Sequence, residues 1–168
     1  MSLKGILLYS LRAAVFAAAA CGIYVGICLL GKRRLRIKTL LGTAYIAALI
    51  QITVLRGGID WQSVFSGSRE LPQLVPLGTT IGLLHGGAWS LIYNIAGNLL
   101  WFVPLGLMLG RRSAIRALLL GAALSAAIEI SQYLLMTGFT DIDDVIFNAA
   151  GSLMGWLLYR RLPKRWQI

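Results

Sequence analysis

The sequence predicts an all-α integral membrane protein, folded as a bundle of about five transmembrane helices. Hydrophobic residues make up 58% of the 168-residue chain and charged residues only 13%, whereas a soluble domain carries roughly 25% charged residues. Such a chain has too little polar surface to cover a water-soluble globule, so lipid is the expected solvent. The apolar residues also occur in long runs, and the basic residues lie between these runs.

Five stretches are apolar enough and long enough to cross a hydrocarbon core of about 30 Å, which takes roughly 17–25 helical residues. We expect helices because every backbone polar group in lipid must be satisfied within the protein. The length suits a single membrane domain, 1–168, without a separate soluble module. The expected spans are residues 7–30, 39–55, 91–110, 117–137 and 144–160.

The basic residues predict how the bundle is oriented. Twelve of the sixteen Lys and Arg residues lie between the first two spans, between the third and fourth, or after the fifth. By the positive-inside rule these segments are cytoplasmic, which places the N-terminus outside and the C-terminus in the cytoplasm. The net charge of +10 is therefore interpreted as a topology signal, and no nucleic-acid partner is expected. The three groups are Lys32, Arg33, Arg34, Arg36 and Lys38; Arg111, Arg112 and Arg116; and Arg160, Arg161, Lys164 and Arg165.

The long connection over residues 56–90 then lies on the outer side. It is about half apolar, but proline and glycine interrupt it too often for a span. Trp61 and Trp89 are typical of the headgroup level of a membrane. We expect an interfacial or re-entrant segment that folds over the outer mouth of the bundle.

Polar side chains inside the spans are costly in lipid and are candidates for function. Glu129 lies twelve residues along the fourth span, roughly 18 Å from its cytoplasmic end. Ser125, Gln132 and Tyr133 stand four residues before it and three and four after it, so all four share one helix face. An unpaired carboxylate would cost several kcal/mol at this depth, and we therefore expect a functional role for Glu129.

Two other spans carry polar pairs at a similar depth. Asn94 and Asn98 lie four residues apart in the third span, and Asp144 and Asn148 repeat that spacing at the start of the fifth. We predict a polar pocket that opens outward, although the amides alone could be interhelical hydrogen-bonding groups worth about 0.6–2 kcal/mol. The residues expected to bind a ligand are Asn94, Asn98, Glu129, Gln132, Asp143, Asp144 and Asn148.

The acidic segment before the fifth span has two readings. Asp141 can cap the helix while Asp143 and Asp144 complement its positive end, or the segment can bind a divalent cation or a cationic ligand. Its spacing does not match a calcium loop. With one histidine in the chain and no ligand-spaced partner, no zinc site is expected. No cofactor is predicted either.

Three motifs resemble those of the VanZ-like family of membrane proteins. Asn98 to Gly106 is similar to its Asn-x-x-x-Phe-x-Pro-x-Gly signature, and Ser125 to Gln132 to its Ser-x-x-x-Glu-x-x-Gln element. Asp144 to Gly151 resembles its Asp-x-x-x-Asn-x-x-Gly element. The likeness covers about residues 71–160, including a Leu-Val-Pro-Leu stretch at 74–77, and two additional helices, 7–30 and 39–55, precede it. We expect Pro104, Gly106, Gly151 and Gly155 to be structural, the last two as a small-residue packing face.

One departure from the family pattern stands out. Members often carry an arginine just before the acidic element, where this chain has Gly138 or Phe139. A salt bridge or anion contact at that position is therefore not carried over to this chain.

The resemblance implies a link to resistance against teicoplanin and related lipid-tailed glycopeptides, in the plasma membrane of a bacterium. The first hypothesis is a protein that binds or handles an amphiphilic envelope molecule, either a lipoglycopeptide or a lipid-linked cell-wall precursor, with membrane lipids as its other partners. The alternatives are an enzyme acting on a lipid headgroup with Glu129 as acid or base, a small flippase or transporter, and a purely structural assembly partner. A binding protein is preferred to an enzyme, and the sequence leaves the ligand and the oligomeric state open.

Overall fold

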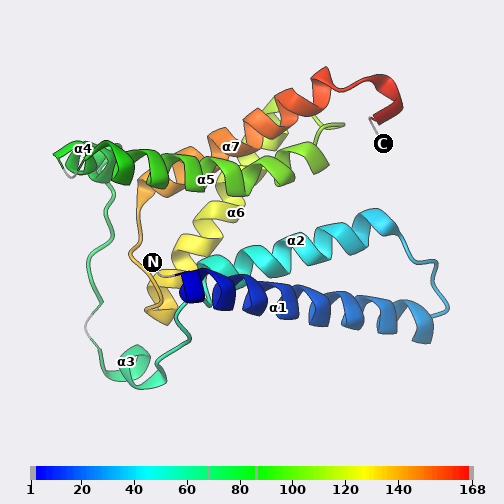
Figure 1. Ribbon diagram of the computed structural model, residues 1–168, viewed down its shortest axis with the longest axis horizontal. Coiled ribbons are helices and arrows are strands. Elements are labelled where there is room, and N and C mark those ends of the chain that lie inside the picture. Colours follow the sequence, from blue (N-terminus) through cyan, green and yellow to red (C-terminus); the bar gives the residue numbers. More distant parts are fainter. Residues whose placement is uncertain (1–2, 68, 86, 167–168) are drawn as a thin grey trace. The chain divides into compact units, whose positions relative to one another are not determined.

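The structure is a computed structural model that describes residues 3–67, 69–85 and 87–166, and these residues form helices and their connections (Figure 1). They divide into two compact units, Met1–Asp60 and Trp61–Ile168, which are described separately. The α-helices are α1 Leu3–Leu30, α2 Ile37–Thr53, α3 Trp61–Ser66, α4 Gly78–His85, α5 Ala88–Met108, α6 Ala114–Leu135 and α7 Ile142–Arg161, followed by a 3₁₀ turn, Lys164–Trp166.

The predicted all-α membrane fold is confirmed, and each predicted span corresponds to one helix, namely α1, α2, α5, α6 and α7. Among the described residues, three helices are long and apolar enough to cross a membrane: Ser10–Leu30 within α1, Ala88–Met108 and Ala114–Leu135. α2 has only 17 residues, and α7 carries two acidic residues in its first turn and two basic ones in its last. The count of five spans and their orientation remain predictions.

The first unit is a helical hairpin in which α1 and α2 lie side by side (Figure 1). α1 ends because Lys32 adopts a left-handed conformation, with φ of 49°. The amide of Lys32 donates to the carbonyl of Leu29 (3.2 Å), and that of Arg33 donates to Cys28 (2.8 Å). These two bonds make a Schellman motif, which satisfies the last carbonyls of the helix and reverses the chain.

In the second unit, α5 and α7 pack backbone against backbone (Figure 1). A methyl group added at Gly151 would collide with the carbonyl oxygen of Leu99, and one added at Gly155 would collide with that of Val103. One added at Gly106 would meet the carbonyl oxygen of Ser152. Small residues allow this close approach because they leave the helix backbones uncovered.

α6 packs on α7 through small residues as well. The hydroxyl of Ser152 is fully buried and donates to the carbonyl oxygen of Ala117 at 2.8 Å. A methyl group at Gly121 would lie 2.6 Å from the Cβ atom of Ser152. The contact between α6 and α7 is therefore also too close for larger side chains.

The distribution of side chains is the reverse of that in a soluble protein. Ser125, Asp143 and Ser152 are among the most buried residues, while Leu29 and Leu30 are 74% and 89% exposed. In water this arrangement would be unfavourable, whereas lipid solvates large apolar side chains and drives polar groups together. The burial pattern thus agrees with an apolar solvent around the helices.

Candidate functional site

The predicted site residue Glu129 lies on α6 and holds the connection between α6 and α7. Its side chain is only 5% exposed, and its Oε2 atom accepts a hydrogen bond from the backbone amide of Asp141 at 2.8 Å. The backbone carbonyl of Glu129 also accepts a bond from the Thr140 hydroxyl at 3.3 Å. A carboxylate that receives a backbone amide is a strong local anchor, so Glu129 fixes where α7 begins.

Asp141 is the N-cap of α7. Its Oδ1 atom accepts the backbone amide of Asp143 at 2.9 Å, as expected of an aspartate that satisfies a free amide at a helix start. Capping by Asp141 is thus seen in the structure, and binding of a cation or cationic ligand by the segment stays a prediction. Within the described ranges, no three His, Cys, Asp or Glu side chains gather as a metal site would require.

Asp143 holds a distant part of the chain. It is 1% exposed, and its Oδ1 atom accepts the amide of Leu77. Its Oδ2 atom accepts the amide of Thr80 at 3.0 Å and the hydroxyl of the same residue at 2.8 Å. Both carboxylate oxygens therefore bind the start of α4, where the helix dipole also favours a negative charge. Asp143 attaches the 71–85 segment to α7.

A backbone contact completes this attachment. Gln73 and Asp141 form an isolated parallel bridge, in which the Gln73 amide donates to Thr140 and the Ile142 amide donates to Gln73, both at 2.9 Å. The segment after α3 thus runs against the connection that carries the acidic residues. Residues 73–80 of the 56–90 segment thus contact the acidic residues, and the interfacial or re-entrant position of the segment at the outer mouth of the bundle stays a prediction.

Asn98, Asp144 and Asn148 join the three long helices of the second unit. The amide of Asn98 on α5 donates to the carboxylate of Asp144 on α7. The amide of Asn148 donates to the hydroxyl of Ser125 on α6 at 2.7 Å, and that hydroxyl donates to the backbone carbonyl of Asp144 at 3.5 Å. The Oδ1 atom of Asn148 is buried without a hydrogen-bond partner among the described residues.

Gln132 and Asn94 are the other two predicted residues. Gln132 is 9% exposed, and a methyl group at Gly138 would lie 3.0 Å from its Nε2 atom. Asn94 is half-buried on α5, one turn before Asn98, and its side chain shows no hydrogen bond within the described parts of the chain. The hydrogen bonds described above thus involve five of the seven predicted residues: Asn98, Asp144 and Asn148 in one group, and Glu129 and Asp143, linked through Asp141, in another.

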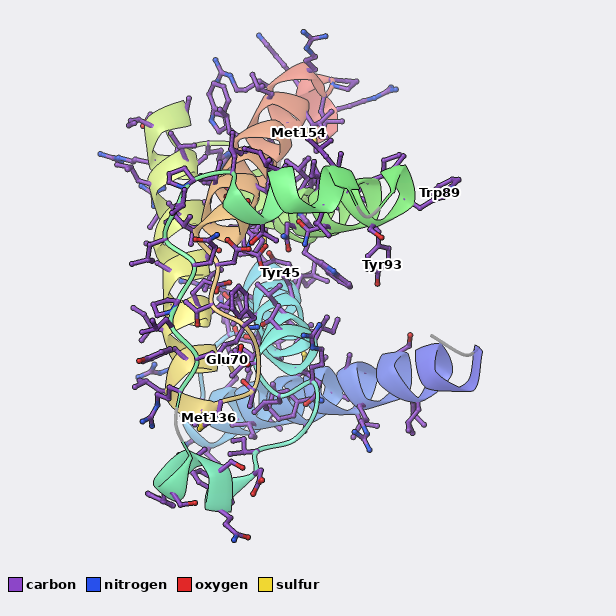
Figure 2. The ribbon with its side chains drawn as sticks, turned by 90° about the vertical axis from the view of Figure 1, so that its left-hand side faces the viewer. Tyr45, Glu70, Trp89, Tyr93, Met136 and Met154 are labelled. Carbon is purple, nitrogen blue, oxygen red and sulfur yellow. The ribbon has the colours of Figure 1, made fainter. Side chains whose placement is uncertain are left out.

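A cavity of about 410 Å³ lies beside Glu129 and Gln132, at the C-terminal end of α6. The helix stops there because Met136 is left-handed, with φ of 52°. Thr140 and Gly138, which touch Glu129 and Gln132 respectively, form part of the wall, and Figure 2 shows Glu70 and Met136 along this end of the helix. The lining residues are Arg69, Glu70, Tyr133, Met136, Thr137, Gly138, Phe139 and Thr140.

Arg69 is a candidate residue that the sequence motifs did not indicate. Its guanidinium lies over the ring of Tyr133, 5.9 Å from the ring centre, and donates weakly to the carbonyls of Val64 (3.4 Å) and Leu134 (3.5 Å). Members of the family often carry an arginine where this chain has Gly138 or Phe139. Arg69 lines the same cavity as both of these residues. Only its charge within a largely apolar connecting segment could have drawn attention to it.

Thr137 adds a polar group to the same cavity. Its hydroxyl oxygen is buried and has no hydrogen-bond partner among the described residues. A buried polar atom normally has a partner. The cavity is thus lined by Arg69, Glu70 and Thr137 beside the apolar residues Phe139 and Met136.

Residues 42–163 match the family model described as VanZ/LLP1. The chain belongs to the VanZ/LLP1 family. Together with the apolar helices, this makes it a membrane protein. The matched range begins within α2 and contains the whole polar network and the cavity of this VanZ/LLP1 protein. No curated protein and no solved structure is significantly similar to it.

Proposed function

We propose that this VanZ/LLP1 protein binds an amphiphilic envelope molecule in the cavity at the C-terminal end of α6. The observation that carries the proposal is the composition of this cavity, in which Arg69, Glu70 and Thr137 lie beside Phe139 and Met136. A ligand with one polar group and one apolar part would satisfy both kinds of surface. The family resemblance suggests a lipoglycopeptide such as teicoplanin or a lipid-linked cell-wall precursor.

The charge distribution predicts that this end of α6 faces outward, because Arg111, Arg112 and Arg116 lie at the other end. A ligand arriving from the outer leaflet of a bacterial plasma membrane would then reach the cavity directly. Arg69 would pair with a phosphate or carboxylate of the ligand, for which the planar guanidinium is well suited. Glu70 would accept hydrogen bonds from an amine or hydroxyl group.

The buried polar residues have a different part in this proposal. The carboxylate oxygens of Glu129, Asp141 and Asp143 accept backbone amides at the start of α4 and at the start of α7. Glu129 also accepts the Thr140 hydroxyl, and so holds the connection after α6 that forms one wall of the cavity. A binding site is precise when such supporting contacts position the groups that touch the ligand.

Binding is favoured over catalysis by the surroundings of Glu129. A general acid or base has to come within hydrogen-bond reach of the group that gains or loses the proton. Glu129 is 5% exposed, and its Oε2 atom already accepts the amide of Asp141. We therefore assign it a positioning role.

A direct binding measurement tests the proposal. Purified protein in lipid nanodiscs would be titrated with fluorescent teicoplanin and, separately, with a lipid-linked cell-wall precursor. Arg69→Gln should weaken binding by about tenfold or more, since a charged hydrogen bond is worth roughly 1.5–3 kcal/mol. Arg56→Gln is the matched control, because it removes the same charge from the same predicted side but outside the cavity. Equal affinities for both variants would refute the site.

A cellular assay tests the resistance part of the proposal separately. Cells that lack the protein would receive wild type, Arg69→Gln or Arg56→Gln at matched expression, and teicoplanin inhibition would be measured. Protection by wild type and Arg56→Gln but not by Arg69→Gln is the expected result. If wild type fails to protect, the ligand is not the drug, and the precursor titration decides whether the cavity binds an envelope lipid.

A further inference from the structure

A second cavity lies in the first unit, at the turn between α1 and α2, and has a volume of about 530 Å³. Three arginines line it: Arg33, Arg34 and Arg36. A topology signal requires positive charge near a membrane surface and does not require that three arginines line one cavity.

The local structure explains why the arginines gather there. The left-handed Lys32 and the bond from the Arg33 amide to the Cys28 carbonyl turn the chain back over the end of α1. The Arg36 amide then donates to the hydroxyl of Tyr24 at 3.2 Å, which ties the far end of the turn to α1. Both contacts are made by backbone amides, so the arginine side chains are not needed to form the turn.

The positive charge at this turn is not balanced by acidic residues nearby in the sequence. Residues 1–59 contain eight Lys and Arg residues and no Asp or Glu, and the first acidic residue is Asp60. Arg33, Arg34 and Arg36 carry like charges within four residues, and an anion bound beside them would lower their mutual repulsion. Residues 1–59 hold no carboxylate that could supply this anion.

The rim of the cavity indicates what kind of anion fits. Large apolar side chains are exposed on both helices next to the turn, including Ile27 at 56%, Leu30 at 89% and Ile37 at 69%. A free anion would leave this apolar surface uncovered. A phospholipid would place its phosphate among the arginines and its acyl chains along these side chains, and basic pockets between helices are known to bind anionic headgroups in this way.

We propose that the turn between α1 and α2 is a binding site for an anionic phospholipid, with Arg33, Arg34 and Arg36 around the phosphate. The site lies wholly within Met1–Asp60 and does not depend on the proposed function of the α6 cavity. On the predicted orientation the lipid belongs to the cytoplasmic leaflet.

Native mass spectrometry of the intact protein tests this site. The protein would be released from nanodiscs of mixed phosphatidylglycerol and phosphatidylcholine, and the lipid that remains bound would be counted. R33Q/R34Q/R36Q should lower phosphatidylglycerol retention by about tenfold or more. The control R111Q/R112Q/R116Q removes three arginines from the other unit and should change retention by less than about twofold. An equal loss in both variants would mean diffuse electrostatic attraction and would overturn the site.

A charge-preserving variant separates loss of the binding site from misfolding or inverted insertion of the glutamine variant. R33K/R34K/R36K keeps the topology signal but replaces the bidentate guanidinium by a point charge. We expect phosphatidylglycerol retention about threefold below wild type and above that of the glutamine variant. Retention equal to wild type would rule out recognition by guanidinium groups.

Two further measurements show whether the bound phosphate belongs to a lipid or is a free anion. Inorganic phosphate at millimolar concentration should not displace phosphatidylglycerol, because it cannot cover the apolar rim. Complete displacement would make the turn a free-anion site and overturn the lipid assignment. Equal retention of phosphatidylcholine and phosphatidylglycerol would overturn it as well, since the uncompensated arginines require a net negative ligand.

Discussion

Met1–Asp60 and Trp61–Ile168 are both helical and apolar, but they use their polar residues differently. In the first unit the charges gather at the turn, and the threonine hydroxyls of α2, such as that of Thr43, bond to carbonyls of their own helix. In the second unit polar side chains link α5, α6, α7 and the 71–85 segment to one another. The polar side chains of the first unit thus leave its fold as a simple helical hairpin. Those of the second unit hold its helices and the 71–85 segment in one specific arrangement.

The same contrast holds for glycine. A methyl group at Gly22 or Gly26 in α1 would meet nothing within 4 Å, but one at Gly151 or Gly155 would collide with the backbone of α5. Both pairs look alike in sequence, since each places two glycines four residues apart. Only the second pair is used for close helix packing, and substitutions can measure how far the two units differ.

The largest difference should come from glycine substitution. Gly151→Leu is expected to lower the free energy of unfolding by about 3 kcal/mol or more, because the carbonyl of Leu99 is backbone and cannot move aside. Gly22→Leu should leave stability nearly unchanged. Thermal unfolding of both variants in the same detergent is the measurement, and equal melting temperatures would show that α5 and α7 do not pack this closely.

The next largest effect should follow from removing the Asp143 carboxylate. Asp143→Ala leaves the amides of Leu77 and Thr80 without their acceptor, at a cost of about 2 kcal/mol. Hydrogen exchange should accelerate over residues 71–85 and stay unchanged over α1 and α2. Glu70→Ala removes an exposed acidic group from the same unit and serves as the control. Unchanged exchange at 77–80 would contradict the role given to Asp143.

A smaller effect is expected for the bond between Asn148 and Ser125. A double-mutant cycle of Ser125→Ala and Asn148→Ala should give a coupling energy of about 0.6–1.7 kcal/mol, the range for interhelical hydrogen bonds in membranes. Thr43→Ala, which removes a bond within one helix, should change stability by less than about 0.5 kcal/mol. The two units would prove alike if the coupling energy were zero, or if Thr43→Ala lowered the free energy of unfolding by as much as that coupling energy.

The smallest expected effect compares two left-handed residues. Lys32→Gly should stabilise the protein by about 0.5 kcal/mol, because glycine adopts positive φ without steric cost. Met136→Gly removes the same strain, but it also removes a side chain that packs against Gly67. The contact is close, because a methyl group added to Gly67 would lie 3.0 Å from the Met136 Cε atom. We expect no gain there. Chemical denaturation of the two variants in one detergent would reveal the difference, and an equal gain would show that Met136 contributes no packing.

The sequence by itself determined the class of the fold and the places of its long helices. Apolar runs and basic connections are local signals, and each predicted span ended within a few residues of the observed helix; the third, for example, was expected at 91–110 and is found at Ala88–Met108. Spacing along α6 also identified Glu129 and Gln132 as a shared buried face. These features follow from helix periodicity and hydropathy, which depend only on neighbouring residues.

The tertiary structure decided what those residues contact. The sequence predicted Asp143 as a ligand-binding residue, but only the folded chain shows that its carboxylate accepts the amide of Leu77, 66 residues earlier in the chain. Arg69 reaches the carbonyl of Leu134 across 65 residues and lines a cavity that no motif indicated. Contacts of this kind depend on the path of the connection between α3 and α5. Its proline, glycine and scattered apolar residues follow no helical or strand period, so only the folded chain shows where that connection lies.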